Sequence, residues 1–100
     1  MEKRKPTYGL DAFKAAVAGE RIVFTKTAAL ATRALGYTDA DIAQALAALE
    51  RKHFFKSMTS YADHRQWQDV YHLPHDGLTL YVKFTADAVM EFLVLSFTEK

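Results

Sequence analysis

The chain has 100 residues, half of them hydrophobic and a quarter charged, with a formal net charge of +1. This composition predicts one globular domain over residues 1–100, excludes a disordered chain, and is too balanced in charge to identify a nucleic-acid binder. The absence of cysteine excludes disulfides and thiolate zinc sites, and with no long apolar run or apolar leader we expect a soluble cytoplasmic protein that neither spans nor contacts a membrane.

The first part of the chain predicts two helices with a short extended run between them. Apolar residues recur at helical spacing over 10–17, and Gly19 is expected to end this first helix. The run 21–24 is rich in β-prone residues. A second helix follows, which we expect Thr27 to cap and Gly36 to end.

A third helix is predicted from Thr38 onwards, because the segment 38–41 is a variant of the capping box. The apolar side chains of this helix repeat on one face: Ile42, Leu46 and Leu49. We expect Arg51 and Lys52 in its last turn, where positive charge suits the helix dipole.

The second half of the chain is strand-like. Four β-rich runs are predicted as strands: 53–58, 66–73, 78–85 and 89–97. A polar loop over 59–65 and turns at 74–77 and 86–88 separate them. Helices first and an antiparallel meander afterwards predict an α+β fold, with the N-terminal helices packed on one face of a C-terminal antiparallel sheet.

The alternation of the run 78–85 predicts which side chains face away from the helices. Its apolar residues belong under the helices, so Tyr81 and Lys83 point to the open face. A two-residue turn at 75–76 or 76–77 pairs even positions with odd ones. That register adds three residues of the preceding strand to the open face: Gln68, Val70 and His72.

The same register turns Trp67, Asp69 and Tyr71 toward the helices. Asp69 then needs a buried partner or a bulge. A tight turn at 86–87 would add five residues of the last strand to the open face: Met90, Phe92, Val94, Ser96 and Thr98. Such a face is too apolar to meet water alone, so we expect something to cover part of it.

The segment between Arg51 and Lys83 holds all four histidines and mixes cations with aromatic rings. This mixture suits RNA, because rings stack on bases and cations meet phosphates, although aromatic residues are also ordinary strand formers. RNA cleavage requires that the 2′-OH lose a proton, that the phosphorane's charge be stabilised and that O5′ gain a proton.

Several residues could supply this chemistry. The open face offers Gln68, Tyr81 and Lys83, and Lys56 could join them from the preceding strand. His64 and His72 compete as the acid or base, and we interpret His72 and His75, beside Pro74, as turn residues. The irregular histidine spacing gives no metal-ligand template, and phosphate-binding and nucleophile motifs are absent; we expect no metal and no cofactor.

Three segments resemble the motility quorum-sensing regulator toxin family over nearly the whole chain. They read MEKRxP over 1–6, FxKSMTxYxDHxxWQDVY over 54–71 and SFxEK over 96–100, and Tyr81-x-Lys83 also fits. The resemblance implies a RelE-like microbial ribonuclease fold. It also implies a toxin of a type II toxin–antitoxin pair that cuts free mRNA at GCU triplets without a metal or the ribosome, which leads to growth arrest, persistence and biofilm formation.

The resemblance further implies a cognate antitoxin with a zinc-binding part and a helix-turn-helix part that binds operator DNA. The end of the last strand (Phe92, Val94) or an exposed sheet edge could receive this antitoxin by strand addition. A rival hypothesis is a binding module without turnover that co-regulates its operon.

By the same resemblance, the catalytic residues are Lys56, Gln68 and Tyr81. We add His64 and Lys83 as secondary candidates. The sequence departs from the family at Thr98, where a lysine of the active site is common. Either activity is weaker, or another cation substitutes for that lysine: Lys83, Arg65 or Lys100.

Overall fold

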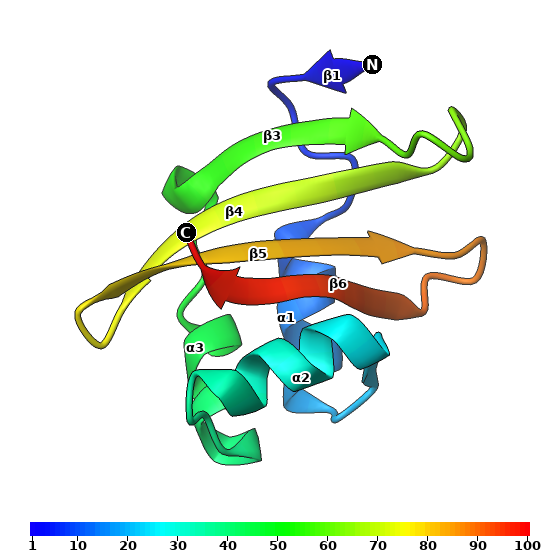
Figure 1. The fold of residues 1–100 in the computed structure, drawn as a ribbon. Coiled ribbons are helices and arrows are strands. Elements are labelled where there is room, and N and C mark those ends of the chain that lie inside the picture. The colour runs from blue at the N-terminus through cyan, green and yellow to red at the C-terminus, as the bar shows by residue number, and fades with distance from the viewer.

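Three helices lie together on one side of a six-stranded sheet in the computed structural model, which describes residues 1–100 (Figure 1). The helices are α1 (Leu10–Ala18), α2 (Lys26–Ala34) and α3 (Asp39–Ala47), and a short 3₁₀ helix, η1 (Arg51–His53), leads into the sheet. The strands are β1 (Glu2–Lys3), β2 (Ile22–Phe24), β3 (Phe54–Thr59), β4 (Trp67–His75), β5 (Leu78–Ala86) and β6 (Phe92–Glu99). The α+β class and the single layer of helices are confirmed. None of these helices has the length and apolarity needed to cross a bilayer.

The strands follow the order β1-β3-β4-β5-β6-β2. All neighbours are antiparallel except β2, which runs parallel to β6 and corresponds to the β-prone run predicted at 21–24. The N-terminal strand β1 was not predicted. It pairs with β3, with Glu2 opposite Met58 and Lys3 opposite Ser57, so the start of the chain extends the sheet.

Two helix boundaries differ from the prediction. Thr25, and not Thr27, caps α2, because Thr25 has extended backbone and its Oγ1 accepts the Ala28 N–H. Helix α3 has the predicted capping box at Thr38 but ends at Ala47. Arg51 and Lys52 therefore lie in η1 and not in the last turn of α3.

The β4–β5 hairpin has the predicted register. Asp76 and Gly77 form its turn with φ angles of 50° and 79°, as a type I′ turn requires. His72 is opposite Tyr81, and Val70 is opposite Lys83. His72 and His75 lie within β4, which corrects their interpretation as turn residues. Pro74 is tolerated because the pairing of β3 with β4 begins at Phe54 opposite Tyr71, so that beyond Tyr71 the strand β4 pairs only with β5.

The β5–β6 connection is longer than the predicted two-residue turn. In it, the Asp87 carboxylate accepts the N–H groups of Val89 and Glu91. The pairing then shifts between Lys83 opposite Ser96 and Phe84 opposite Val94, which leaves one extra residue in β6. Ser96 and Thr98 keep the predicted open face.

The outward placement of Phe92 and Val94 was wrong. The bulge reverses the face that this part of β6 presents, and both side chains are buried in the core under the helices. Met90 lies in the loop before β6. The open face therefore lacks three of the apolar side chains predicted for it, Met90, Phe92 and Val94.

Asp69 points toward the helices, as predicted, and has the buried partners that it needs. Its side chain is fully buried. The carboxylate accepts the backbone N–H groups of Thr7, at 3.1 Å, and Tyr8, at 2.9 Å. The charge is thus stabilised by the segment that joins β1 to α1.

We expect Asp69→Ala to lower the free energy of unfolding by about 3 kcal/mol, because it leaves buried N–H groups without an acceptor. Urea denaturation measures this. Asp63→Ala is the matched control, since the exposed Asp63 carboxylate also accepts a backbone N–H, from Arg65, and should change stability by less than about 1 kcal/mol. Equal effects at the two sites would contradict the assignment.

Candidate active site

A pocket of about 720 Å³ lies on the open face of the sheet, beside the loop over residues 60–66. Side chains from β1, β3, β4, β5 and this loop line it: Met1, Glu2, Lys56, Met58, Thr59, Ser60, Tyr61, Ala62, His64, Gln68 and Lys83. Four of the predicted site residues are thus brought together, namely Lys56, Gln68, His64 and Lys83.

A bulge in β3 turns Lys56 into this pocket. Phe54 is opposite the core residue Tyr71, whereas Lys56 is opposite Val70 on the open face. In a regular strand, residues two apart share one face. The register shift at Phe55 therefore allows Phe54 to face the core while Lys56 faces the pocket.

Lys56 forms an ion pair with Glu2. The two side chains meet at 2.7 Å between Nζ and Oε1, and the lysine side chain is only 25% exposed. The hydrogen bond and the positive charge of Lys56 lower the pKa of Glu2. The pocket thus holds an ionised carboxylate beside its central cation.

Lys83 is the second cation of the pocket. It lies opposite Val70 on β5, so Val70 is flanked on both sides by lysines of the open face. Val70 is fully buried although it lies outside the main core, and we infer that the aliphatic stems of Lys56 and Lys83 help to cover it. Burial lowers the pKa of Lys83.

Tyr81 and Thr98 lie beside the pocket and not in it. Tyr81 is on the same face as Lys83, two residues away along β5, or about 7 Å, and Thr98 is opposite Tyr81 on β6. The structure therefore does not place the predicted tyrosine in contact with the Lys56–Glu2 pair.

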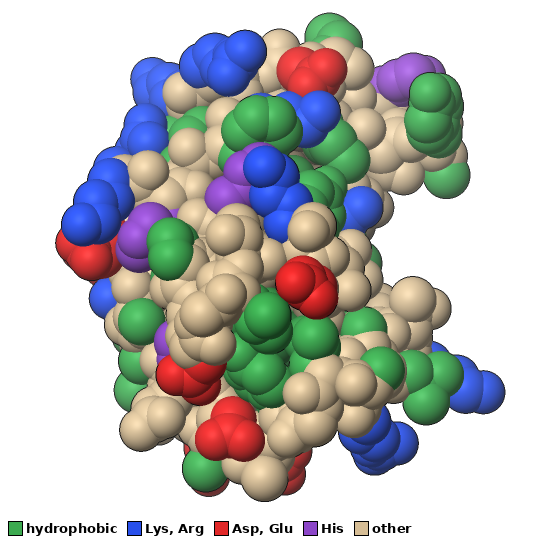
Figure 2. Space-filling view, turned by 60° about the vertical axis from the view of Figure 1, so that its left-hand side comes forward, with side chains coloured by type: hydrophobic (Ala, Val, Ile, Leu, Met, Phe, Trp, Pro, Cys, Tyr) green, Lys and Arg blue, Asp and Glu red, His purple; other side chains and the backbone are tan.

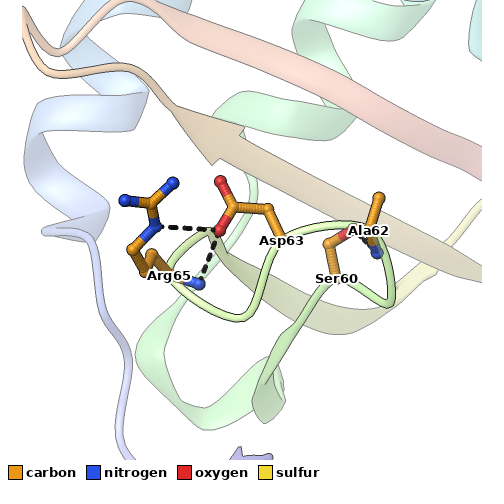
Figure 3. A network of polar contacts seen from close by, with 4 residues as sticks. All are labelled: Ser60, Ala62, Asp63 and Arg65. Carbon is orange, nitrogen blue, oxygen red and sulfur yellow. Dashed lines mark hydrogen bonds and ion pairs between the residues drawn. The ribbon is translucent and has the colours of Figure 1, made fainter.

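Arg65 is held by Asp63 within the loop, outside the pocket (Figure 3). The Asp63 carboxylate accepts the Arg65 backbone N–H at 2.9 Å and its Nε–H at 3.3 Å, and these bonds lower the pKa of Asp63. Ser60 forms a similar local bond, accepting the Ala62 N–H. The loop is thus shaped by its own side chains, and Tyr61 is fully exposed on it.

An aromatic row adjoins the pocket. The Phe55 ring stacks on His72 with centroids 4.3 Å apart, and Tyr81 follows at 5.8 Å from His72. Phe55 is 40% exposed. In Figure 2, most of the basic side chains in view lie in the upper half, at the height of β1 and β3 in Figure 1. The aromatic row and the basic side chains therefore lie in the same region, around β1 and β3.

Glu2 is the one acidic side chain of the pocket, and the sequence-based prediction missed it. The basic start of the chain has no alternating pattern long enough to predict a strand. The segment MEKRxP was noted only for its resemblance. The structure contains no group of three or more histidine and carboxylate side chains that could hold a metal ion.

The comparisons with known proteins agree with the resemblance. Residues 5–99 match the family model described as the motility quorum-sensing regulator, toxin of MqsA. The chain is also 35% identical over 100 residues to the mRNA interferase toxin MqsR of Escherichia coli (strain K12), and the match covers the full length of both proteins.

We expect His72 to titrate below its usual pKa of 6.5 and to be neutral at pH 7. Burial lowers its pKa most, followed by the charges of Lys100 and Lys56. The folded state then binds the proton less well than the unfolded state, so this group reduces stability as the pH falls through 6.5. Histidine ¹H–¹³C NMR measures the pKa, and Lys100→Gln should raise it; a wild-type value at or above 6.5 would refute the expectation.

Proposed function

Because the chain belongs to the motility quorum-sensing regulator toxin family, we propose that it is the toxin of a type II toxin–antitoxin pair and an endoribonuclease that cleaves mRNA in the cytoplasm. The observation that carries this proposal is the pocket that unites Lys56, Gln68 and Lys83 beside an aromatic row. We further propose that it acts without the ribosome, a metal or another cofactor, and at GCU triplets.

RNA would lie across the open face of the sheet. Its phosphate meets Lys56 and Lys83, the two cations of the pocket, and a neighbouring unstacked base meets the ring of Phe55. Phe55 stacks on the flat imidazole ring of His72, which supports it from behind. Affinity therefore comes from both charge and stacking.

Cleavage would proceed by attack of the RNA's own 2′-OH on the adjacent phosphorus. Lys56 and Tyr81 stabilise the developing charge and move protons, and Gln68 positions the phosphate through its amide. His64 and Lys83 are the secondary candidates. Because Tyr81 lies outside the pocket, its part requires that the substrate extend along β5 from Lys83. The products are a 2′,3′-cyclic phosphate and a 5′-OH.

The partner that we propose is a cognate antitoxin with a zinc-binding part and a helix-turn-helix part that binds operator DNA. Neutralisation of the toxin would relieve growth arrest, with effects on persistence and biofilm formation. Phe92 and Val94 are buried, so they cannot form the docking surface suggested above. The sheet edges are β1 and β2.

The alternative function is a binding module that retains the antitoxin surface without turnover. Thr98 favours it, because an uncharged residue stands where family members commonly carry a lysine of the active site. The presence of two lysines in the pocket favours the enzyme.

We expect the protein to cut a synthetic RNA with one GCU in the presence of EDTA, and mass spectrometry to show a 2′,3′-cyclic phosphate. Lys56→Ala should reduce the rate by about 10²–10³-fold, since it removes a charge from the transition state. Lys52→Ala is the matched control, because Lys52 also pairs with a glutamate but is 72% exposed and outside the pocket. Intact RNA from folded protein that still binds its antitoxin would support the binding module.

Expression in bacteria provides an independent check. The wild type should arrest growth, Lys56→Ala should not, and co-expression of the antitoxin should restore growth of cells that carry the wild type. Colony counts and pulse labelling of new protein measure the effect. Equal toxicity of the wild type and Lys56→Ala, at matched soluble levels, would exclude Lys56 as the basis of arrest.

A further inference from the structure

The Glu2 side chain is placed in the pocket by the pairing of β1 with β3. Glu2 is opposite Met58, and Met58 is opposite Gln68 on β4. These three residues form one row of the open face, beside the row that holds Lys56. The ion pair engages Oε1 of Glu2, and the side chain is 60% exposed, so its other oxygen can accept a proton from a substrate.

We propose that Glu2 is a catalytic residue, the general base that takes the proton from the attacking 2′-OH; this rests on the proposed function of the pocket. A lysine ammonium group is a donor only and has no lone pair to accept a proton. Glu2 is the carboxylate of this pocket. The hydrogen bond from Lys56, and then its charge, keep the pKa of Glu2 low, so the base is ionised at neutral pH.

The order of the strands gives the base and the acid opposite sides of the site. In-line displacement requires that O2′ and O5′ lie on opposite sides of phosphorus. Glu2 stands on β1 and Lys83 on β5, with Lys56 on β3 and Gln68 on β4 between them. Neighbouring strands are about 4.8 Å apart, so the backbones of β1 and β5 are separated by about 14 Å. The long Glu and Lys side chains can close on a phosphate across that span.

The step balances with Glu2 and Lys83, which carry the two proton transfers in place of Lys56 and Tyr81, so that these two only stabilise charge. As O2′ bonds to phosphorus, its proton passes to the Glu2 carboxylate. As the P–O5′ bond breaks, its electron pair stays on O5′, which takes a proton from the Lys83 ammonium. Burial lowers the pKa of Lys83 and so makes it a stronger acid. Exchange with water then restores the carboxylate and the ammonium ion.

A purely electrostatic role of Glu2, as the partner of Lys56, would make its substitution act differently from the loss of a general base. If Glu2 only occupied Lys56 in the free protein, an incoming phosphate would have to displace it. Removal of its charge would then strengthen RNA binding and leave or raise the rate of the chemical step. The two roles therefore predict opposite results for the same substitution.

The test is single-turnover cleavage of the GCU RNA in EDTA by the wild type, Glu2→Gln and Glu2→Asp. We expect Glu2→Gln to lower the maximal rate by about 10²–10⁴-fold with little change in the half-saturating protein concentration, and Glu2→Asp to recover part of it. Glu50→Gln is the matched control, because Glu50 is similarly exposed and also pairs with a lysine, Lys52. A rate within twofold of the wild type, or tighter RNA binding, would overturn the proposal.

The pH profile separates Glu2 from a histidine base. The charged groups around Glu2 are Lys56 from β3, Arg4 and the Met1 amine from its own segment, with His64 and Lys83 across the pocket. A carboxylate base should keep the wild-type rate nearly constant from about pH 8 to about pH 5.5, whereas a histidine with its usual pKa would lose about tenfold. If the wild-type rate falls in this way and the rate of His64→Gln does not depend on pH, the base is His64 and not Glu2.

Lys56→Ala distinguishes the failure of this inference from the failure of the proposed function. If Lys56→Ala abolishes cleavage and Glu2→Gln does not, the pocket is the active site and only the role of Glu2 is wrong. If cleavage occurs and neither substitution affects it, both the pocket assignment and the role of Glu2 are wrong. If the folded wild type cuts no RNA, the proposed function itself fails.

Discussion

The buried carboxylate of Asp69 attaches the segment between β1 and α1 to the central strands of the sheet. It accepts N–H groups from Thr7 and Tyr8, and the same segment is bonded again through the hydroxyls of Thr7 and Ser57, at 2.7 Å. The Tyr8 hydroxyl also donates to the Trp67 carbonyl. Because this segment lies between β1 and α1, its attachment to β3 and β4 holds α1 against the core and β1 on the sheet edge. The position of Glu2 in the pocket therefore depends on a carboxylate on the opposite face of the sheet.

The charge of Asp69 also affects its surroundings. Tyr71, two residues along β4, is fully buried, and its hydroxyl has no hydrogen-bond partner. Burial, and then the nearby Asp69 charge, raises the pKa of Tyr71 to about 12. The phenol therefore stays neutral at neutral pH, so its burial adds no second charge next to the Asp69 carboxyl group.

Two bulges decide what each face of the sheet presents. The shift at Phe55 turns Lys56 to the pocket while Phe54 stays in the core, and the shift after Val94 buries Phe92 and Val94 while Ser96 and Thr98 face outward. Alternation alone predicts one face for all even positions of a strand, so it fails at a bulge.

The alternation of apolar and polar residues succeeded in the β4–β5 hairpin, where a type I′ turn at Asp76-Gly77 fixes a regular register. The inward position of Asp69 followed from that register, but its partners did not, because Thr7 and Tyr8 are distant in sequence and lie in no regular element.

The departure of Thr98 from the family pattern is best understood from the placement of the cations. Thr98 is opposite Tyr81, one row away from the pocket, and a lysine there would reach the site only along the sheet. Lys83 lies in the pocket itself and is half-buried. A cation confined in a partly desolvated site interacts more strongly with a phosphorane than an exposed one, because less water screens it.

Of the three cations that could replace the family lysine, Arg65 is bound to Asp63 in the loop and Lys100 is exposed at the end of the chain. Lys83 is therefore the one whose position suits the proposed chemistry, and the absence of a charge at Thr98 is compatible with the proposed enzyme.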